Sequence, residues 1–405
     1  MMIRKCFTGL TLLLTLLMLG GCSFMRNNSD TVTPAISPAA TEEPTKTPLP
    51  TSTPTPSPTP TVTPTPVVTN ESRAKELLQD MSLEEKVGQL FFVRLRKAQA
   101  IEDINTYHLG GYILFGDDFK EETKASIKDL TAAYQAASSI PLLIGVDEEG
   151  GNVNRISKYP AFRAVPFHSP KDLYTEGGFD LIKSDTLEKA TLLLKLGINV
   201  NLAPVCDVST NPSDFIYHRT FGMDAANTSE YIKAVVEVMK EQRLGSTLKH
   251  FPGYGNNVDT HTGIAIDERD YNTFVSSDFL PFEAGIEAGA DSILVSHNIV
   301  TSMDKDYPAS LSKEVHKILR NELGFEGVVM TDDLSMDAIK EYTGDSDAAV
   351  LAIEAGNDLL IATNFMEQIP AVIDAVKDNI ISMERIDESV LRVLIWKLSL
   401  GIISE

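Results

Sequence analysis

The segment best suited to acid–base chemistry is KHFPGYGNNVDTHTG, at positions 249–263. Lys249 and His250 end an apolar run, and the proline and glycines that follow predict an irregular loop. That loop carries Asp259 and His261, and a carboxylate so close in sequence can orient an imidazole and stabilise its cation. Because histidine titrates near neutral pH, it can donate a proton and later take one back. We therefore predict an Asp259–His261 dyad that acts as a general acid and base.

A second segment, GVVMTDDLSM at positions 327–336, supplies a candidate nucleophile. Asp332 follows directly after a short apolar run that has the composition of a buried strand. A carboxylate presented at the end of a strand, separate from the dyad, is suited to nucleophilic attack. The neighbouring Asp333 would point elsewhere, and we expect it to cap the helix that follows.

The elements that must position these residues form a repeating unit, in which an amphipathic helix, a glycine and a short apolar strand follow one another. The glycines stand just past the helices, where a positive φ is needed. The strands are continuous apolar runs, as expected for parallel strands that are buried on both faces. Eight such strands are predicted, at 89–95, 110–115, 142–147, 198–205, 245–251, 290–297, 327–333 and 357–363.

Eight strands with helices between most of them predict a single (β/α)8 TIM barrel. The alternative is a doubly wound sheet, which would place a glycine-rich phosphate turn after its first strand, and this sequence has no such turn there. In a TIM barrel the active site lies at the carboxyl ends of the strands. The polar residues at predicted strand ends should therefore converge: Asp147, Lys249, His250, His297 and Asp332.

Composition narrows the class of ligand. Asp and Glu number 57 against 35 Lys and Arg, which gives a formal net charge of −22. Nucleic-acid binding needs a basic surface, so we expect no nucleic-acid partner and favour a sugar polymer or a small molecule. Of the three cysteines, only Cys206 lies in the predicted globular part, which excludes a disulfide framework there. No zinc or phosphate-loop motif stands out.

The N-terminal part predicts secretion and anchoring. Residues 1–21 have a basic start and an apolar stretch too short to span a bilayer well. They lead into Leu19-Gly20-Gly21-Cys22, which resembles a bacterial lipobox, so we expect lipidation of Cys22 and a membrane-anchored lipoprotein on the cell surface. The alternative is an ordinary secretory signal. Residues 22–70 are mostly Thr, Pro and Ser and should form a disordered, extended tether before a catalytic domain at 71–405.

Several short pieces share their order and spacing with one known family. They are Asp147-Glu148-Glu149-Gly150-Gly151 with Arg155, NLAPVCDV at 201–208, Arg219-Thr220-Phe221-Gly222, KHFPGYG at 249–255, Asp259-Thr260-His261 and Thr331-Asp332-Asp333. From about Leu77 onward, the sequence resembles the β-N-acetylglucosaminidases of glycoside hydrolase family 3, the NagZ type.

The resemblance implies a retaining exo-glycosidase that needs no metal or organic cofactor. Asp332 would attack the anomeric carbon and form a covalent glycosyl-enzyme, which most retaining glycosidases achieve with two carboxylates. His261 would serve as the acid and base, held by Asp259. The residues that would bind the sugar hydroxyls and the N-acetyl group are Asp147, Arg155, Arg219, Lys249, His250 and His297.

The sequence also departs from the family pattern. Tyr254 stands where members usually have a histidine, and Asn152 where arginine is frequent. A chain ending at Glu405 leaves no room for the second domain from which many family 3 β-glucosidases take their acid/base, which favours the glucosaminidase.

The expected substrates are peptidoglycan fragments or chitooligosaccharides, cleaved by a monomer. Three alternatives stay open: a β-glucosidase, a phosphorylase on the same fold, and a non-catalytic cell-wall-binding lipoprotein.

Overall fold

The computed structural model describes residues 69–257, 263–343 and 345–403 of the chain. Its main sheet contains eight parallel strands in the order β11-β9-β7-β6-β3-β2-β1-β12, and a bridge between Met330 and Leu359 brings the two outer strands together. The prediction of a (β/α)8 TIM barrel is therefore confirmed. The strands are β1 (Phe91–Arg94), β2 (Gly111–Leu114), β3 (Leu143–Val146), β6 (Val200–Asn201), β7 (Gly245–Phe251), β9 (Ser292–Val295), β11 (Val328–Thr331) and β12 (Leu360–Ala362).

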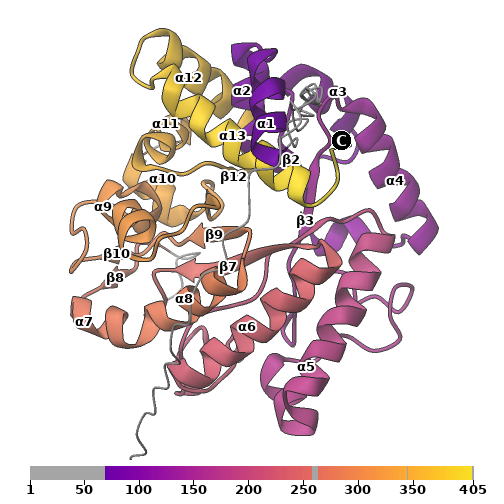
Figure 1. Cartoon of the computed structure of the whole chain (residues 1–405), viewed down its shortest axis with the longest axis vertical. Helices are drawn as coiled ribbons and strands as arrows, with labels where there is room; N and C mark the ends of the chain where they lie inside the picture. Colours follow the sequence, from indigo (N-terminus) through magenta and orange to yellow (C-terminus); the bar gives the residue numbers. More distant parts are fainter. Residues whose placement is uncertain (1–68, 258–262, 344, 404–405) are drawn as a thin grey trace, which may run out of the picture. The chain divides into compact units, whose positions relative to one another are not determined.

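Helices surround this sheet, and Figure 1 shows α5, α6 and α8 side by side along one flank of the barrel. The helix α2 begins with a capping box, in which Ser82 accepts a hydrogen bond from the backbone of Glu85 and the Glu85 side chain accepts one from the backbone of Ser82. The helices are α1 (Asn70–Gln79), α2 (Leu83–Gln89), α3 (Ala100–Tyr107), α4 (Lys124–Ala137), α5 (Pro170–Lys195), α6 (Ala225–Gln242), α7 (Tyr271–Thr273), α8 (Phe279–Ala288), α9 (Lys313–Lys317), α10 (Asp337–Thr343), α11 (Asp345–Ala355), α12 (Phe365–Lys377) and α13 (Met383–Ser399).

Short elements decorate the loops. The strands β4 (Glu148–Gly150) and β5 (Val153–Asn154) form an antiparallel hairpin directly after β3, and β8 (Ile266–Asp267) pairs in parallel with β10 (Ile299–Val300). The hairpin matters for function, because it begins at the carboxyl end of a barrel strand. The predicted signal segment, Cys22 and the tether up to residue 68 lie outside the described residues.

The helix α13 closes the amino-terminal end of the barrel. Its residues Val393, Trp396 and Leu400 join the apolar cluster that fills the barrel interior. Trp396 lies against Gly245, the first residue of β7, so this tryptophan packs at the end opposite to the carboxyl ends of the strands. Trp396 therefore belongs to the core, and α13 fills the amino-terminal end of the barrel interior.

The buried carboxylate of Asp358, just before β12, ties this helix to the sheet. It lies 3.1 Å from Arg392 and 3.5 Å from Arg385, both on α13, and 2.5 Å from Arg320. Separately, no helix within residues 69–257, 263–343 and 345–403 is both long enough and apolar enough to cross a lipid bilayer.

Candidate active site

A pocket of about 390 Å³ opens at the carboxyl ends of the barrel strands. Lys249 and His250 belong to β7, Asp147 follows β3 and Asp332 follows β11. Since parallel strands of a barrel end at the same face, side chains far apart in the sequence meet there. The predicted site residues that line the pocket are Asp147, Arg155, Arg219, Lys249, His250 and Asp332.

A cluster of compensated charges forms the floor of this pocket. The ammonium of Lys249 is 2% exposed and lies 2.6 Å from Asp147 Oδ1 and 2.7 Å from Glu149 Oε1. Burial by itself would raise the pKa of Glu149, but the charges of Arg219 and Lys249 hold it well below its usual value. Burial would likewise lower the pKa of Lys249, and the two carboxylates raise it instead. Glu149, Arg219 and Lys249 are therefore charged at neutral pH, and the cluster presents both donors and acceptors.

His250 is held by partners on both ring nitrogens. Its Nδ1 lies 2.8 Å from Asp207 Oδ2, and its Nε2 lies 3.1 Å from Nη2 of Arg219. Because a guanidinium can only donate, Nε2 accepts, and the ring proton must sit on Nδ1 and point to Asp207. The same carboxylate accepts hydrogen bonds from the backbone N–H groups of His250 and Tyr254. Asp207 thus fixes the orientation and the tautomer of His250.

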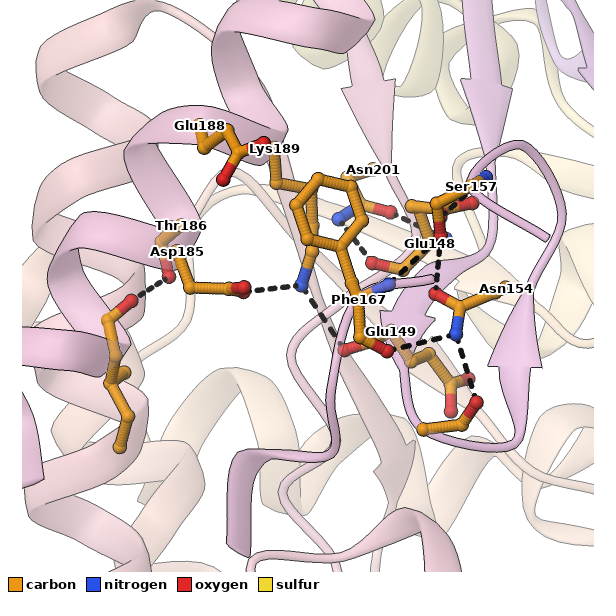
Figure 2. Close-up of polar contacts among 12 residues, drawn as sticks. Glu148, Glu149, Asn154, Ser157, Phe167, Asp185, Thr186, Glu188, Lys189 and Asn201 are labelled. Carbon is orange, nitrogen blue, oxygen red and sulfur yellow. Dashed lines mark hydrogen bonds and ion pairs between the residues drawn. The ribbon is translucent and has the colours of Figure 1, made fainter. Parts of the chain in front are cut away.

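The hairpin after β3 is fixed by a separate network, and Figure 2 shows the part of it around Glu148, Ser157 and Asn201. The buried Glu148 carboxylate accepts hydrogen bonds from three successive backbone N–H groups, those of Arg155 and Ile156 at 2.8 Å and that of Ser157 at 3.0 Å. The backbone of Glu148 itself exchanges two hydrogen bonds with the side chain of Asn201. These contacts hold the chain on both sides of the hairpin and so place Arg155, whose Nη2 lies 3.8 Å from Asp147.

The backbone next to this network is braced by α5. Lys189 donates a hydrogen bond of 3.3 Å to the carbonyl oxygen of Glu149 and forms an ion pair of 3.3 Å with Asp185 (Figure 2). All three residues are buried. The carboxylate of Glu149 points to the pocket while its carbonyl is held from behind, so its position is set from both ends.

Asp332 lies at the wall formed by the loop after β11. Its backbone N–H donates to the carbonyl of Val295, and its Oδ1 accepts a 2.8 Å hydrogen bond from the N–H of Asp333. The carboxylate of Asp333 accepts from the N–H of Ser335 and from the hydroxyl of Thr363. Asp333 therefore stabilises the turn that carries Asp332, whereas the expectation that it caps the next helix is wrong, because α10 begins only at Asp337.

His297 lies behind this wall. Its side chain is fully buried, with Nδ1 2.7 Å from Ser310 Oγ and Nε2 3.1 Å from the carbonyl oxygen of Asp333. It is not among the described residues that line the pocket. The structure thus brings His297 to the turn beneath Asp332 and not to the surface where the sequence analysis expected it to bind the sugar.

Asp259 and His261, the predicted dyad, lie outside the described residues, as does Cys22. The chain leading to them is described as far as Asn257, and Tyr254 there packs edge-on against the ring of His250, with 5.2 Å between ring centres. Within the part of the chain that the structure describes, no three His, Cys, Asp or Glu side chains cluster as metal ligands would.

Four pocket or supporting residues escaped the sequence analysis: Arg94, Phe115, Glu149 and Asp207. Glu149 was visible as part of a motif, and its place two residues after Asp147 put it close to the predicted strand end. Asp207 follows a cysteine in an irregular stretch, where no local pattern reveals its bond to His250. Arg94 ends β1 and could have been found by the same strand-end rule that found Asp147.

Comparison with known proteins agrees with this geometry. The family model described as the glycosyl hydrolase family 3 N terminal domain matches residues 82–395. A β-hexosaminidase of Nitrosomonas eutropha is 33% identical over 261 residues, which are 63% of this chain and 74% of the relative. The β-hexosaminidase LpqI of Mycobacterium tuberculosis is 31% identical over 332 residues, 78% of this chain and 83% of the relative.

Among solved structures, a family 3 β-N-acetylglucosaminidase from a Paenibacillus strain superposes with a TM-score of 0.75 at 30% identity. The match covers 80% of this chain and 63% of that chain, so this chain spans less than two thirds of that protein. The family model alone covers more than half of the sequence. The chain is a member of glycosyl hydrolase family 3.

Proposed function

We propose that the protein is a retaining exo-β-N-acetylglucosaminidase, which removes terminal β-linked N-acetylglucosamine from a glycan. The observation that carries the proposal is the meeting of Asp332, on one pocket wall, with the cluster around Lys249 and Glu149 on the floor. Asp332 places a nucleophile beside the position that an anomeric carbon could take. The cluster around Lys249 and Glu149 offers paired donors and acceptors for sugar hydroxyls. The β-hexosaminidase activity named for the relatives supports the same reaction.

In the proposed first step, a carboxylate oxygen of Asp332 attacks the anomeric carbon as the bond to the leaving oxygen breaks. The N–H of Asp333 holds Oδ1 of this carboxylate. His261, positioned by Asp259, protonates the leaving oxygen. In the second step the neutral His261 takes a proton from water, the water oxygen attacks the anomeric carbon, and Asp332 is released. Two displacements at one carbon retain the configuration.

The floor of the pocket would recognise the sugar without carrying a net charge. Arg219 and Lys249 donate, Asp147 accepts, and each charge is already balanced by a partner. Neutral hydroxyl groups can replace water in such a network, whereas a free ion gains little there. Arg155 adds donors at the rim. This arrangement favours neutral hydroxyl groups over a charged group at the floor of the pocket.

The test is the release of chromophore from aryl β-N-acetylglucosaminide and aryl β-glucoside by the purified protein, in buffer free of phosphate. Faster cleavage of the first supports the proposal. Preference for the glucoside would replace it with a β-glucosidase. Turnover only after inorganic phosphate is added, with release of a sugar 1-phosphate, would indicate a phosphorylase. Cleavage of neither under any condition would favour the non-catalytic, wall-binding alternative.

We further propose that Cys22 is lipidated, that residues 22–70 tether the catalytic domain to the outer face of a bacterial membrane, and that the domain works there as a monomer. The lipobox-like sequence before Cys22 supports the anchor. An enzyme so placed would meet peptidoglycan fragments or chitooligosaccharides. Partition of the protein into detergent, compared with a Cys22→Ser variant, tests the anchor. Light scattering on the purified protein tests the monomer.

A further inference from the structure

Arg94 and Phe115 line the pocket but lie outside the hydroxyl-binding floor. Arg94 is the last residue of β1, and Phe115 follows directly after the neighbouring strand β2, so the two side chains leave adjacent strand ends. The guanidinium carbon of Arg94 lies 4.2 Å from the centre of the Phe115 ring. Such stacking fixes the plane of a guanidinium while leaving the N–H groups on its edge able to donate.

Arg94 differs from the other cations of the pocket, because no ion pair joins it to a carboxylate in the part of the chain that the structure describes. Lys249 and Arg219 are bound to buried carboxylates, and Arg155 lies within 3.8 Å of Asp147. For Arg94, none of the carboxylates in residues 69–257, 263–343 and 345–403 lies within ion-pair distance, and its contact with Phe115 is the interaction that the structure shows. Its side chain is exposed at the pocket.

Asp118 is a carboxylate on which the charge of Arg94 acts. Burial raises the pKa of Asp118, and the hydrogen bond from the backbone N–H of Phe115 and the charge of Arg94 act in the opposite direction. The carboxylate is thus occupied by the backbone, at 2.7 Å, and feels Arg94 only through space. Asp118 does not neutralise Arg94 by direct contact, so the guanidinium edge stays available to a ligand.

A second positive charge lies near the same ring. The guanidinium carbon of Arg155 is 5.6 Å from the centre of Phe115. Two guanidinium groups beside one aromatic ring raise the local potential, and an anion between or beside them would lower the electrostatic energy of both. This is a local exception in a chain with a net charge of −22, which would otherwise repel anions.

We propose that Arg94 and Phe115 form an accessory subsite for a negatively charged oxygen group carried by the glycan. The guanidinium would donate two parallel hydrogen bonds to a carboxylate or to an acidic ester, which is the geometry that arginine prefers. The proposal rests on the proposed function, because it adds a charge requirement to the same substrate. The anion belongs either to the sugar next to the cleaved bond, as in a lactyl ether of the muramic type, or to an ester on the terminal N-acetylglucosamine.

The experiment compares kcat/KM of the full-length protein and its Arg94→Gln variant on three substrates. These are neutral chitobiose, the disaccharide of N-acetylglucosamine and N-acetylmuramic acid, and an aryl β-N-acetylglucosaminide that carries a 6-O-sulfate. We expect Arg94→Gln to lower the ratio of anionic to neutral kcat/KM by about 10-fold for one of the two charged substrates, because a charge-assisted pair is lost. The substrate that shows the loss identifies which sugar bears the anion.

Lys97→Gln is the matched control. It removes one positive charge from the chain that follows β1, but Lys97 pairs with Glu122 and is not a described lining residue of the pocket. Its anionic-to-neutral ratio should stay at the wild-type value. High salt should reduce the preference of the wild type for the anionic substrate over the neutral one, and it should leave this ratio unchanged in Arg94→Gln. An equal effect of Arg94→Gln on charged and neutral substrates, or the same shift in Lys97→Gln, would overturn the subsite.

A binding measurement separates this proposal from the proposed function. If the wild type cleaves no β-N-acetylglucosaminide, the proposed function fails, and calorimetry with free sugars still tests the subsite. The probes are N-acetylmuramic acid and N-acetylglucosamine 6-phosphate, each compared with N-acetylglucosamine. Tighter binding of either charged sugar to the wild type, lost in Arg94→Gln, supports the subsite. Binding that is the same for charged and neutral sugars, or the same in both proteins, contradicts it.

Discussion

Arg219 binds Glu149 through two parallel contacts, with Nε 3.0 Å from Oε2 and Nη2 2.7 Å from Oε1. Glu149 is also 2.7 Å from the buried ammonium of Lys249, so one carboxylate balances two cations from different strands and loops. The site depends on this residue although the sequence analysis did not select it. Its carboxylate organises the two donors that the family resemblance assigns to sugar binding.

Glu149→Gln should therefore damage both stability and activity. The amide would leave Arg219 without its ion-pair partner and Lys249 with Asp147 alone, and breaking a buried pair costs about 3–5 kcal/mol. We expect a clear fall in the urea midpoint and a rise in KM for aryl β-N-acetylglucosaminide. The control is Glu188→Gln, since Glu188 pairs with Arg163 with similar geometry at the surface and is 56% exposed. It should cost less than about 1 kcal/mol, and equal losses in the two variants would contradict the account.

Asp207→Asn tests the orientation of His250. In the wild type, the Asp207 carboxylate accepts a hydrogen bond from Nδ1–H of His250, and Nε2 of the same ring accepts one from Arg219. An amide can present its NH2 group to the ring, which favours the other tautomer and removes the acceptor at Nε2. Loss of one charge-assisted hydrogen bond should lower kcat/KM by about 10- to 100-fold. NMR of ¹⁵N-labelled histidine reports the tautomer directly, and an unchanged Nδ1–H signal in the variant would refute this role.

Glu148→Ala and Glu148→Gln should form a graded pair. Alanine would leave three backbone N–H groups of residues 155–157 without their acceptor, at a cost of about 1–3 kcal/mol for each buried group. Glutamine keeps one acceptor oxygen and should lose less. In thermal unfolding, we expect Tm to fall in the order wild type, Glu148→Gln, Glu148→Ala. KM should rise in the same order, because Arg155 is no longer held in place. A stable Ala variant with unchanged KM would show that the network does not position Arg155.

Lys397→Met should stabilise the protein in a pH-dependent way. Lys397 is completely buried in α13, donates 2.6 Å to Gln89 Oε1, and burial lowers its pKa to about 7. Since the unfolded chain keeps its ordinary pKa near 10.5, the unfolded state binds more protons between those values, and wild-type stability rises with pH there. Below pH 7 the buried charge is present in full.

The advantage of Lys397→Met should accordingly be largest at pH 7 and below, at about 2–6 °C in Tm, and shrink by pH 9. Lys377→Met, at a lysine that is 56% exposed, serves as the control and should show no such trend. A constant difference in Tm between wild type and Lys397→Met across this pH range would mean that the lysine does not titrate in the folded protein.

The barrel could be predicted because its signals are local. Each of the eight barrel strands lies within its predicted segment, and β7 matches Gly245–Phe251 at both ends. The segment predicted at 198–205 has ladder pairing at Val200–Asn201 and a single further bridge at Val205, before the irregular stretch that carries Asp207. Strand ends are set by pairing partners, which a single sequence does not display.

The site was predictable where a residue stands at a strand end and was missed where its role depends on a distant partner. Asp147 and Lys249 were found by the first rule, whereas Asp207 acts on His250 across 43 positions of sequence. His297 shows the limit of that rule. It lies two residues beyond β9, where the chain has already turned beneath Asp333, so its ring is buried in the supporting layer.

The most direct test of the central claim is to trap the covalent intermediate on Asp332. The purified protein is incubated with a 5-fluoro-N-acetylglucosaminyl fluoride, and the intact mass and digested peptides are measured. We predict one N-acetylglucosaminyl-type label per chain, on the peptide that contains Asp332, and no label and at least about 10³-fold lower kcat in Asp332→Asn. A label on another residue, or an Asp332→Asn variant that turns over at the wild-type rate, would contradict it.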